Sequence, residues 1–312
     1  MKKQNLHPRN KNNSQYNFPK LTKIYPALNP YVIKNKYGNL SIDYFDPSAV
    51  KALNAALLKY HYDIDWDIPA GYLTPPIPGR SDYIHYMADV LKDSHQSSKN
   101  TIPKNITFLD IGTGANCIYP IIGAAEYGWS SIGSDISKAS LDNAASIIQS
   151  NKLLQEKIKL RKQDSSTHYF KNIIHEDEYF DFTICNPPFF SSAAETIKSN
   201  KRKQKNLTTR QNTNSNFNFG GNAHELWCDG GELEFIKQLI QESFVYKYSC
   251  FWFSTLVSKE AHINPIKLTL EKFEPTEVKI IEMSQGQKTS RIIAWTFLSK
   301  KQKKIWSELR WE

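Results

Sequence analysis

The segment Leu109–Cys117, LDIGTGANC, decides the fold class of this chain. The apolar residues that lead into it have the composition of a buried strand, which ends at Gly112, with Gly114 following. The next stretch, CIYPIIGAAEYG, fits a helix closed by Gly128, with Pro120 confined to its first turn. A strand, a glycine turn and a helix mark the point where a parallel sheet binds a nucleotide-like ligand.

Strands and helices alternate from residue 105 to residue 312, which predicts a mostly parallel α/β sheet. The last two strands have no helix between them, so we expect one antiparallel member at the edge of the sheet. The predicted strands are residues 106–112, 129–137, 157–164, 180–186, 250–256, 277–283 and 291–298, and the predicted helices include residues 138–151 and 230–246.

Residues 1–104 differ in character and are predicted to form a helical extension. Residues 1–29 are polar and basic and are typical of an extended arm, whereas residues 47–62 carry apolar side chains at helical spacing. Residues 66–80 are rich in proline, which favours an extended surface segment, and a second helix follows with Ser81 as its N-cap.

The composition favours an anionic partner, because 40 basic residues against 31 acidic ones leave a net charge of +9. The alternative is a soluble protein that is merely basic, and the run KKQKK near the C-terminus is expected to be a solvated tail. The chain shows no signal peptide and no apolar run near the ~20 residues that span a bilayer. The cysteines lack metal-ligand or redox spacing, so we expect a cytoplasmic protein with reduced thiols, no metal and no membrane partner; they are Cys117, Cys185, Cys228 and Cys250.

The glycine turn suggests a particular ligand. Asp110 lies in the first strand, and Asp135 ends the next one, where a carboxylate can accept hydrogen bonds from both hydroxyls of a ribose. Cys117 replaces the third glycine of the dinucleotide pattern, and no P-loop lysine is present. The pattern D-x-G-x-G with a later acid suits S-adenosylmethionine, and the alternative is a tight turn that binds nothing.

A second motif, Asn186-Pro187-Pro188-Phe189, ends the fourth strand, FDFTICN. The amine of a nucleobase is a poor nucleophile, because its lone pair is delocalised into the ring. The Asn186 side-chain oxygen and the Pro187 carbonyl can accept its two N–H bonds, while the prolines hold that carbonyl rigidly. Phe189 would then stack on the base. The alternative is a tight turn capped by asparagine, with Phe189 in the core.

The connection at residues 191–229 is unusually long and lacks a core pattern, as expected of a functional or disordered loop. Its stretch from Lys198 to Arg210 holds six basic residues and no acid. The basic side chains that we expect to contact phosphate are Lys201, Arg202, Lys203 and Lys205.

The order of several motifs resembles the ribosomal RNA large subunit methyltransferase F family over nearly the whole chain. These motifs are LHPRN, PGRSDYIHYMADVL, LDIGTGANCIYPIIGAAEYGW, CNPPFF, NFGGNAHELWCDGGELEFIKQLI and SQGQKTSRIIAWTF. The resemblance implies a Rossmann-like, class I methyltransferase domain with a seven-stranded sheet. It implies transfer of a methyl group from S-adenosylmethionine to N6 of an adenine in 23S ribosomal RNA, either naked or within a large-subunit assembly intermediate.

The resemblance also implies roles for individual residues. Arg80 would hold the carboxylate of the cofactor, Gly112 and Asp135 would bind its other end, and Asn186 to Phe189 would hold adenine. Asp164 would face the cofactor's adenine, with a strand-end cap as the alternative. Residues 1–104 would bind RNA, as would Lys288 and Arg291, unless these two belong to a plain hairpin turn.

Other activities remain open at this stage. The same tetrapeptide suits methylation of DNA adenine, of guanine N2 or of protein glutamine, because each target is a planar conjugated amine. From a different class, the chain would be a catalytically silent RNA-binding module.

Overall fold

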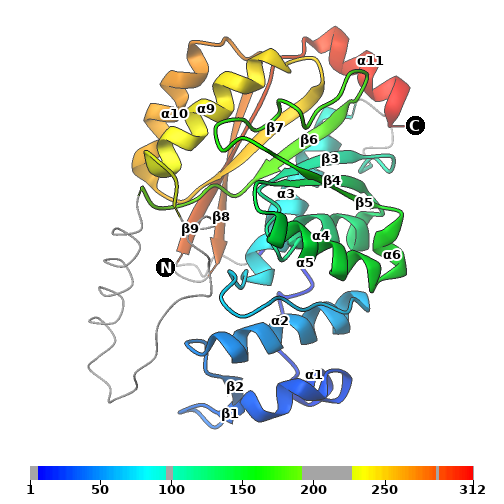
Figure 1. The fold of residues 1–312 in the computed structure, drawn as a ribbon, viewed down its shortest axis with the longest axis vertical. Coiled ribbons are helices and arrows are strands. Elements are labelled where there is room, and N and C mark those ends of the chain that lie inside the picture. Colours follow the sequence, from blue (N-terminus) through cyan, green and yellow to red (C-terminus); the bar gives the residue numbers. More distant parts are fainter. Residues whose placement is uncertain (1–5, 96–100, 192–226, 286–287, 312) are drawn as a thin grey trace.

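The computed structural model describes residues 6–95, 101–191, 227–285 and 288–311. Its centre is a seven-stranded sheet in the order β5-β4-β3-β6-β7-β9-β8 (Figure 1). The strands are β3 Thr107–Ile111, β4 Ser130–Asp135, β5 Ile158–Lys162, β6 Phe180–Cys185, β7 Cys250–Val257, β8 Glu277–Gln285 and β9 Lys288–Thr296. Neighbouring strands from β5 to β7 pair in parallel, so the predicted seven-stranded, mostly parallel α/β sheet is confirmed.

The antiparallel strand is not at the edge, contrary to our expectation. β9 runs antiparallel to both β7 and β8, and it lies between them. Ile292, Ile293 and Trp295 of β9 are all fully buried, which suits a position covered on both faces. β8 exposes Val278 and Ile280 between charged residues, as is common at the edge of a sheet.

Helices cover both faces of the sheet (Figure 1). Phe108 of β3 belongs to the apolar cluster that includes residues of α3, α4 and α5, and its neighbour Leu109 faces the cluster under α9 and α10. These helices are α3 Ile77–Ser94, α4 Ile118–Tyr127, α5 Lys138–Gln149, α9 Gly231–Val245 and α10 Ile263–Glu271, with the short α6 Lys152–Gln155 and the 3-10 turn η2 Glu260–His262 between them in sequence. No helix in the described ranges is both long and apolar enough to cross a bilayer.

The N-terminal part is folded where we expected an extended arm. A small core joins Phe18, Leu21 and Leu28 to Leu53 and Leu57, so three apolar residues spaced among polar ones are enough to order it. Its elements are α1 Phe18–Ile24, η1 Pro26–Tyr31, the hairpin of β1 Val32–Lys34 and β2 Leu40–Ile42, and α2 Pro47–Tyr62.

The motif LHPRN fastens the start of the chain to α3 and α4. His7 is buried, and its Nε2 lies 2.8 Å from a carboxylate oxygen of Asp89. Arg9 forms an ion pair with Asp89 at 2.8 Å and donates a hydrogen bond from Nε to the hydroxyl of Tyr127 at 2.9 Å. The Asn10 side chain donates to Asp82. The first described residues are therefore held by side chains more than seventy positions later in the chain.

The proline-rich segment 66–80 is partly buried rather than wholly superficial. Trp66 and Ile68 join the main core, and the Trp66 indole donates to the carbonyl of Asn116 at 2.9 Å. Helix α3 begins at Ile77, and Ser81 lies inside it, fully buried, so Ser81 is not the N-cap that we expected. Proline is tolerated in the first turn of a helix, so the helix can start before Ser81, at Ile77.

The basic C-terminal stretch is a helix, α11 Lys300–Arg310, and not a solvated tail. Ser299 and Gln302 form a capping box at its start, while Trp306 and Trp311 are buried. Both indoles donate to the fully buried carboxylate of Asp181, at 2.8 and 2.7 Å. The two buried tryptophans thus anchor this highly charged stretch to Asp181 in the protein core.

Candidate active site

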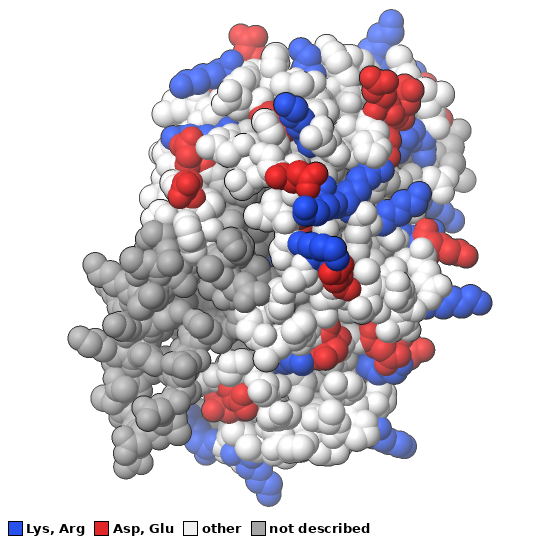
Figure 2. All heavy atoms as spheres, in the orientation of Figure 1, with Lys and Arg blue, Asp and Glu red and all other residues white. Residues whose placement is uncertain are grey.

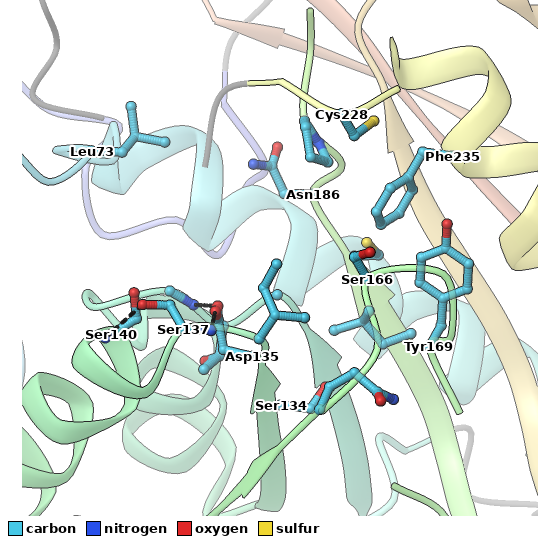
Figure 3. A pocket seen from close by; sticks show the side chains of 18 of the residues that line it. Leu73, Ser134, Asp135, Ser137, Ser140, Ser166, Tyr169, Asn186, Cys228 and Phe235 are labelled. Carbon is cyan, nitrogen blue, oxygen red and sulfur yellow. Dashed lines mark hydrogen bonds between the residues drawn. The ribbon is translucent and has the colours of Figure 1, made fainter. Parts of the chain in front are cut away.

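A pocket of about 750 Å³ opens at the carboxyl ends of β3, β4 and β6 (Figure 3). Its volume lies within the range of ~300–1,000 Å³ that is typical of small-molecule sites. The segment before α3, the turns after β3, β4 and β5, the end of β6 and the start of α9 all contribute to its wall. The predicted site residues that line it are Arg80, Gly112, Gly114, Asp135, Asn186 and Pro188.

The glycine turn after β3 adopts a conformation that favours glycine. Gly112 has φ +73° and Gly114 φ +65°, in the left-handed region. The amides of Gly112 and Thr113 both donate to the carbonyl of Ser134 at 2.9 Å, which holds the turn against β4. A Cβ at Gly133 would lie 3.0 Å from the Thr113 hydroxyl oxygen, so β4 also needs a glycine here.

Asp135 is held with its carboxylate at the pocket wall. One carboxylate oxygen accepts from the Gly114 amide at 2.9 Å, and the other accepts from the Ser137 amide at 2.8 Å (Figure 3). Each oxygen of a carboxylate has more than one lone pair, so further donors can be accepted at the same group. This arrangement fits a ligand that presents hydroxyl groups.

Asp110 does not line the pocket, although we predicted that it binds the cofactor. Its side chain is 1% exposed and lies behind the glycine turn. Burial raises its pKa to about 7, with the neighbouring negative charge of Asp135 adding to the increase. Both carboxylate oxygens of Asp110 are buried, and within the described residues neither has a hydrogen-bond partner.

Arg80 places a buried positive charge at the wall of the pocket. It lies in the first turns of α3, is 8% exposed, and donates from Nη1 to the hydroxyl of Tyr119 at 2.6 Å. Burial raises the pKa of Tyr119 to about 12, so the hydroxyl stays protonated while it accepts this hydrogen bond. A fixed guanidinium in this place is suited to a carboxylate ligand.

The motif after β6 divides between the pocket and the protein interior. Asn186 and Pro188 line the pocket, whereas Pro187 is buried and Phe189 is half-buried outside the lining. The Asn186 side-chain oxygen is buried and has no hydrogen-bond partner in the described part of the chain. A buried acceptor without a partner is costly, which indicates that a ligand supplies the donor. The structure thus places the asparagine, but not Phe189, at the wall.

The segment after β5 lines the pocket with Gln163 and not with Asp164, the residue that we predicted. Asp164 points away from the pocket, since its side chain is 77% exposed and pairs with Lys162 at 2.9 Å. Gln163, 5% exposed, lies on the wall instead. The burial of β5 does not alternate cleanly, so no local signal distinguished these two residues.

Other lining residues were missed altogether. The ring of Tyr169 packs edge-on against that of Phe235, with 4.6 Å between the centroids, and its hydroxyl donates to Gln238 at 3.2 Å. Figure 3 shows the two rings next to each other at the wall of the pocket. The remaining missed residues include Tyr72, Leu73, Pro75, Tyr119, Ser165, Ser166, Thr167, His168, Trp227, Cys228 and Asp229. The motif ELWCDGGE contributes to the family resemblance, but its residues alone predicted no chemical role.

Of the predicted RNA-binding residues, only Arg291 has a side chain that the structure describes. Lys201, Arg202, Lys203 and Lys205 lie outside the described residues, and so does the side chain of Lys288. Arg291 is 11% exposed and pairs with Glu260 at 2.9 Å and with Glu282 at 3.7 Å. Two carboxylates already occupy this guanidinium, which weakens its case as a phosphate ligand.

Comparison with known proteins gives consistent matches. A family described as RNA methyltransferase matches residues 1–299. The ribosomal RNA large subunit methyltransferase F of Bacteroides fragilis is 51% identical, covering 94% of this chain and 98% of that protein, and the protein of the same name from Shewanella halifaxensis is 47% identical, covering 98% and 85%.

Two solved structures have the same overall fold. The catalytic domain of human METTL16 in complex with a MAT2A 3′UTR hairpin superposes with a TM-score of 0.80 at 30% identity, covering 95% of this chain and 96% of that one. The N-terminal domain of human METTL16 in complex with SAH gives 0.74 at 28% identity, covering 95% and 100%.

Proposed function

We propose a specific reaction for this chain, which belongs to the RNA methyltransferase family and uses a cofactor of the S-adenosylmethionine type. It transfers the methyl group of S-adenosylmethionine to the N6 amine of one adenine in 23S ribosomal RNA. The observation that carries the proposal is the buried, unpartnered oxygen of Asn186 on the wall of a pocket that also presents Asp135. Relatives about half identical to this chain bear the name ribosomal RNA large subunit methyltransferase F.

The donor and acceptor groups of the pocket fit this cofactor. The Asp135 carboxylate suits the ribose hydroxyls, and the buried Arg80 guanidinium suits the α-carboxylate. Gly112 and Gly114 let the backbone of the turn approach the cofactor closely. The cofactor supplies a methyl group on a positively charged sulfur, which needs no metal to become reactive.

The chemical role of the Asn186 motif is to prepare the amine. The Asn186 oxygen and the Pro187 carbonyl accept the two N–H bonds of the adenine amine, which directs the nitrogen lone pair toward the methyl group. These acceptors are fixed before the substrate arrives, so little reorganisation is needed during the reaction. Pro187 is buried, and its ring restricts the backbone that carries the second acceptor.

Replacing Asp135 tests the cofactor arrangement. Asp135→Ala removes a charged hydrogen-bond acceptor, which typically contributes about 1.5–3 kcal/mol. We expect the dissociation constant for S-adenosylmethionine, measured by calorimetric titration, to rise by about 10-fold to 150-fold. Asp142→Ala, on an exposed face of α5, serves as the matched control and should leave this constant unchanged. A normal dissociation constant with only a slower rate in Asp135→Ala would rule out the ribose contact.

Residues 1–104 supply RNA-binding surface in this proposal. The chain carries no acidic residue before Asp43, although it carries lysine and arginine throughout this stretch. Blue side chains project from the lower end of the molecule in Figure 2, where α1, β1 and β2 lie. Tyr37 is 74% exposed next to Lys36, and an exposed aromatic ring beside a cation suits an unpaired base.

The basic loop gives a second test, based on its sequence alone. Changing Lys201, Arg202, Lys203 and Lys205 to alanine should weaken RNA binding and leave the affinity for S-adenosylmethionine unchanged. Each phosphate contact with single-stranded RNA contributes about −0.7 to the log–log salt slope, so the slope should flatten by up to about 3. The measurement is RNA affinity across a salt series, and Lys300, Lys301 and Lys304 of α11 provide a control set of exposed lysines. An unaltered slope would leave the loop without a role in phosphate binding.

The proposed reaction is tested on natural RNA. Ribosomal RNA from a bacterial strain lacking this gene is incubated with the protein and labelled S-adenosylmethionine, and mass spectrometry maps the methylated nucleotide. We expect one N6-methyladenine in 23S RNA. Label in DNA, in guanine or in protein would support one of the other amine substrates. Absence of cofactor binding by calorimetry would support a catalytically silent module.

A further inference from the structure

A second orphaned polar atom lies at the same wall as the Asn186 oxygen. The indole nitrogen of Trp227 is buried and, in the ranges that the structure describes, has no hydrogen-bond partner, and Trp227 lines the pocket. Thr113 also lines the pocket with an unpartnered hydroxyl, but that hydroxyl packs against Gly133 beneath the glycine turn. Trp227 is therefore the orphaned donor that remains to be explained.

The backbone fixes Trp227 relative to the Asn186 motif. Phe190, four residues after Asn186, forms a parallel bridge with Trp227, and the next amide, that of Cys228, donates to the Phe190 carbonyl at 3.1 Å. The Gly231 amide closes the turn by donating to the Cys228 carbonyl at 2.9 Å. Figure 3 shows Cys228 and Asn186 among the side chains that line the same pocket. These backbone contacts hold Trp227 beside the segment that follows the Asn186 motif.

An indole can only donate, and a carboxamide oxygen can only accept. Trp227 and Asn186 both line the cavity, and among the described residues the Trp227 nitrogen is a buried donor and the Asn186 oxygen a buried acceptor without a partner. The Watson–Crick edge of adenine carries the complementary pair, the N6 amine as donor and N1 beside it as acceptor. Guanine carries the reverse pair on this edge, a carbonyl oxygen and an N1–H group, and would leave both protein groups unsatisfied.

We propose that Trp227 selects the target base by donating its indole N–H to N1 of the adenine whose amine Asn186 accepts. This inference rests on the proposed adenine methylation and adds a specificity residue to it. A base taken out of its helix is commonly recognised along its Watson–Crick edge. Trp227 does not take part in the methyl transfer itself.

The test uses atom-by-atom changes in the substrate. Three synthetic RNA oligonucleotides carry adenosine, 1-deazaadenosine or 7-deazaadenosine at the mapped target, and kcat/KM is measured for the wild-type protein and for Trp227→Phe. We expect Trp227→Phe to slow adenosine methylation by about tenfold, the scale of one uncharged hydrogen bond. On 1-deazaadenosine the two proteins should be equal, because the acceptor is already absent. On 7-deazaadenosine the tenfold difference should persist.

The controls separate recognition from folding. Trp129→Phe changes a fully buried indole that donates to the Pro103 carbonyl, and it should keep the wild-type preference for adenosine over 1-deazaadenosine. Calorimetric binding of S-adenosylmethionine checks that Trp227→Phe is folded, and Trp227→Met provides a second variant without the donor.

Two results would overturn the inference. The first is an equal loss on adenosine and 1-deazaadenosine in Trp227→Phe, which would make Trp227 a packing residue. The second is a wild-type protein that does not distinguish these two substrates. Failure of the wild-type protein to methylate adenosine at all would instead contradict the proposed reaction on which the inference depends.

Discussion

Asn186→Ala is expected to lower the methyl-transfer rate by about 10²-fold, because one preorganised acceptor at a reacting centre is worth on the order of 3 kcal/mol. The Asn186 oxygen has no partner among the described residues, so removing it breaks no hydrogen bond of the protein itself. The loss should therefore fall on kcat, while the dissociation constant for S-adenosylmethionine stays nearly constant. Single-turnover kinetics with saturating cofactor and RNA measure the rate.

Asn54→Ala is the matched control for this experiment. Asn54 is also a buried asparagine, but it lies in α2 and its side chain donates to the Pro75 carbonyl at 2.7 Å. It should cost stability and leave the rate of methyl transfer unchanged in the folded protein. A full rate in Asn186→Ala would remove this residue from the reaction.

Asp181→Ala is expected to lower the free energy of unfolding by about 3–5 kcal/mol, the usual result of stripping one side from a buried charged network. Asp181 is fully buried and accepts from the Thr107 amide at 2.7 Å, besides the indoles of Trp306 and Trp311. Its removal leaves two buried indoles and one partly buried amide without this acceptor. Equilibrium denaturation followed by tryptophan fluorescence measures the change.

Arg310 provides the comparison for Asp181. Its guanidinium lies 3.3 Å from the Asp181 carboxylate, but its side chain is 28% exposed. Such a partly exposed pair contributes about 0–1 kcal/mol, so Arg310→Ala should have a small effect. Equal effects of the two substitutions would mean that the indole contacts do not stabilise the C-terminal helix.

Local patterns were sufficient to predict the parallel part of the sheet and the part of the pocket wall that Gly112, Gly114 and Asp135 form. The turn at Gly112 and Gly114 is decided within nine residues, since both positions have left-handed backbone, which favours glycine. Asp135 follows because parallel strands bring their carboxyl ends to one edge. Asn186 lies on this edge for the same reason.

Features that depend on distant partners were not predicted. Asp164 and Gln163 are adjacent, and only packing against the 165–171 segment decides which of them faces the pocket. Segment 66–80 has the composition of a surface loop. Trp66 is nevertheless buried, and its indole donates a hydrogen bond to the carbonyl of Asn116, fifty residues later. The order of β8 and β9 in the sheet depends on whether each strand is covered by other parts of the protein. The sequence of a single strand indicates this only weakly.

The fastening of His7 and Arg9 has a consequence for how the polypeptide is made. During synthesis these residues leave the ribosome before α3 and α4, yet Arg9 binds Tyr127, which is 118 positions away. The beginning of the chain must therefore wait, without native contacts, until α3 and α4 have emerged. Pairings between distant positions form slowly, because a long loop must close first. A bulky tag joined to the N-terminus would act at this late docking step, whereas a tag at the other end would follow a helix that already completes the fold.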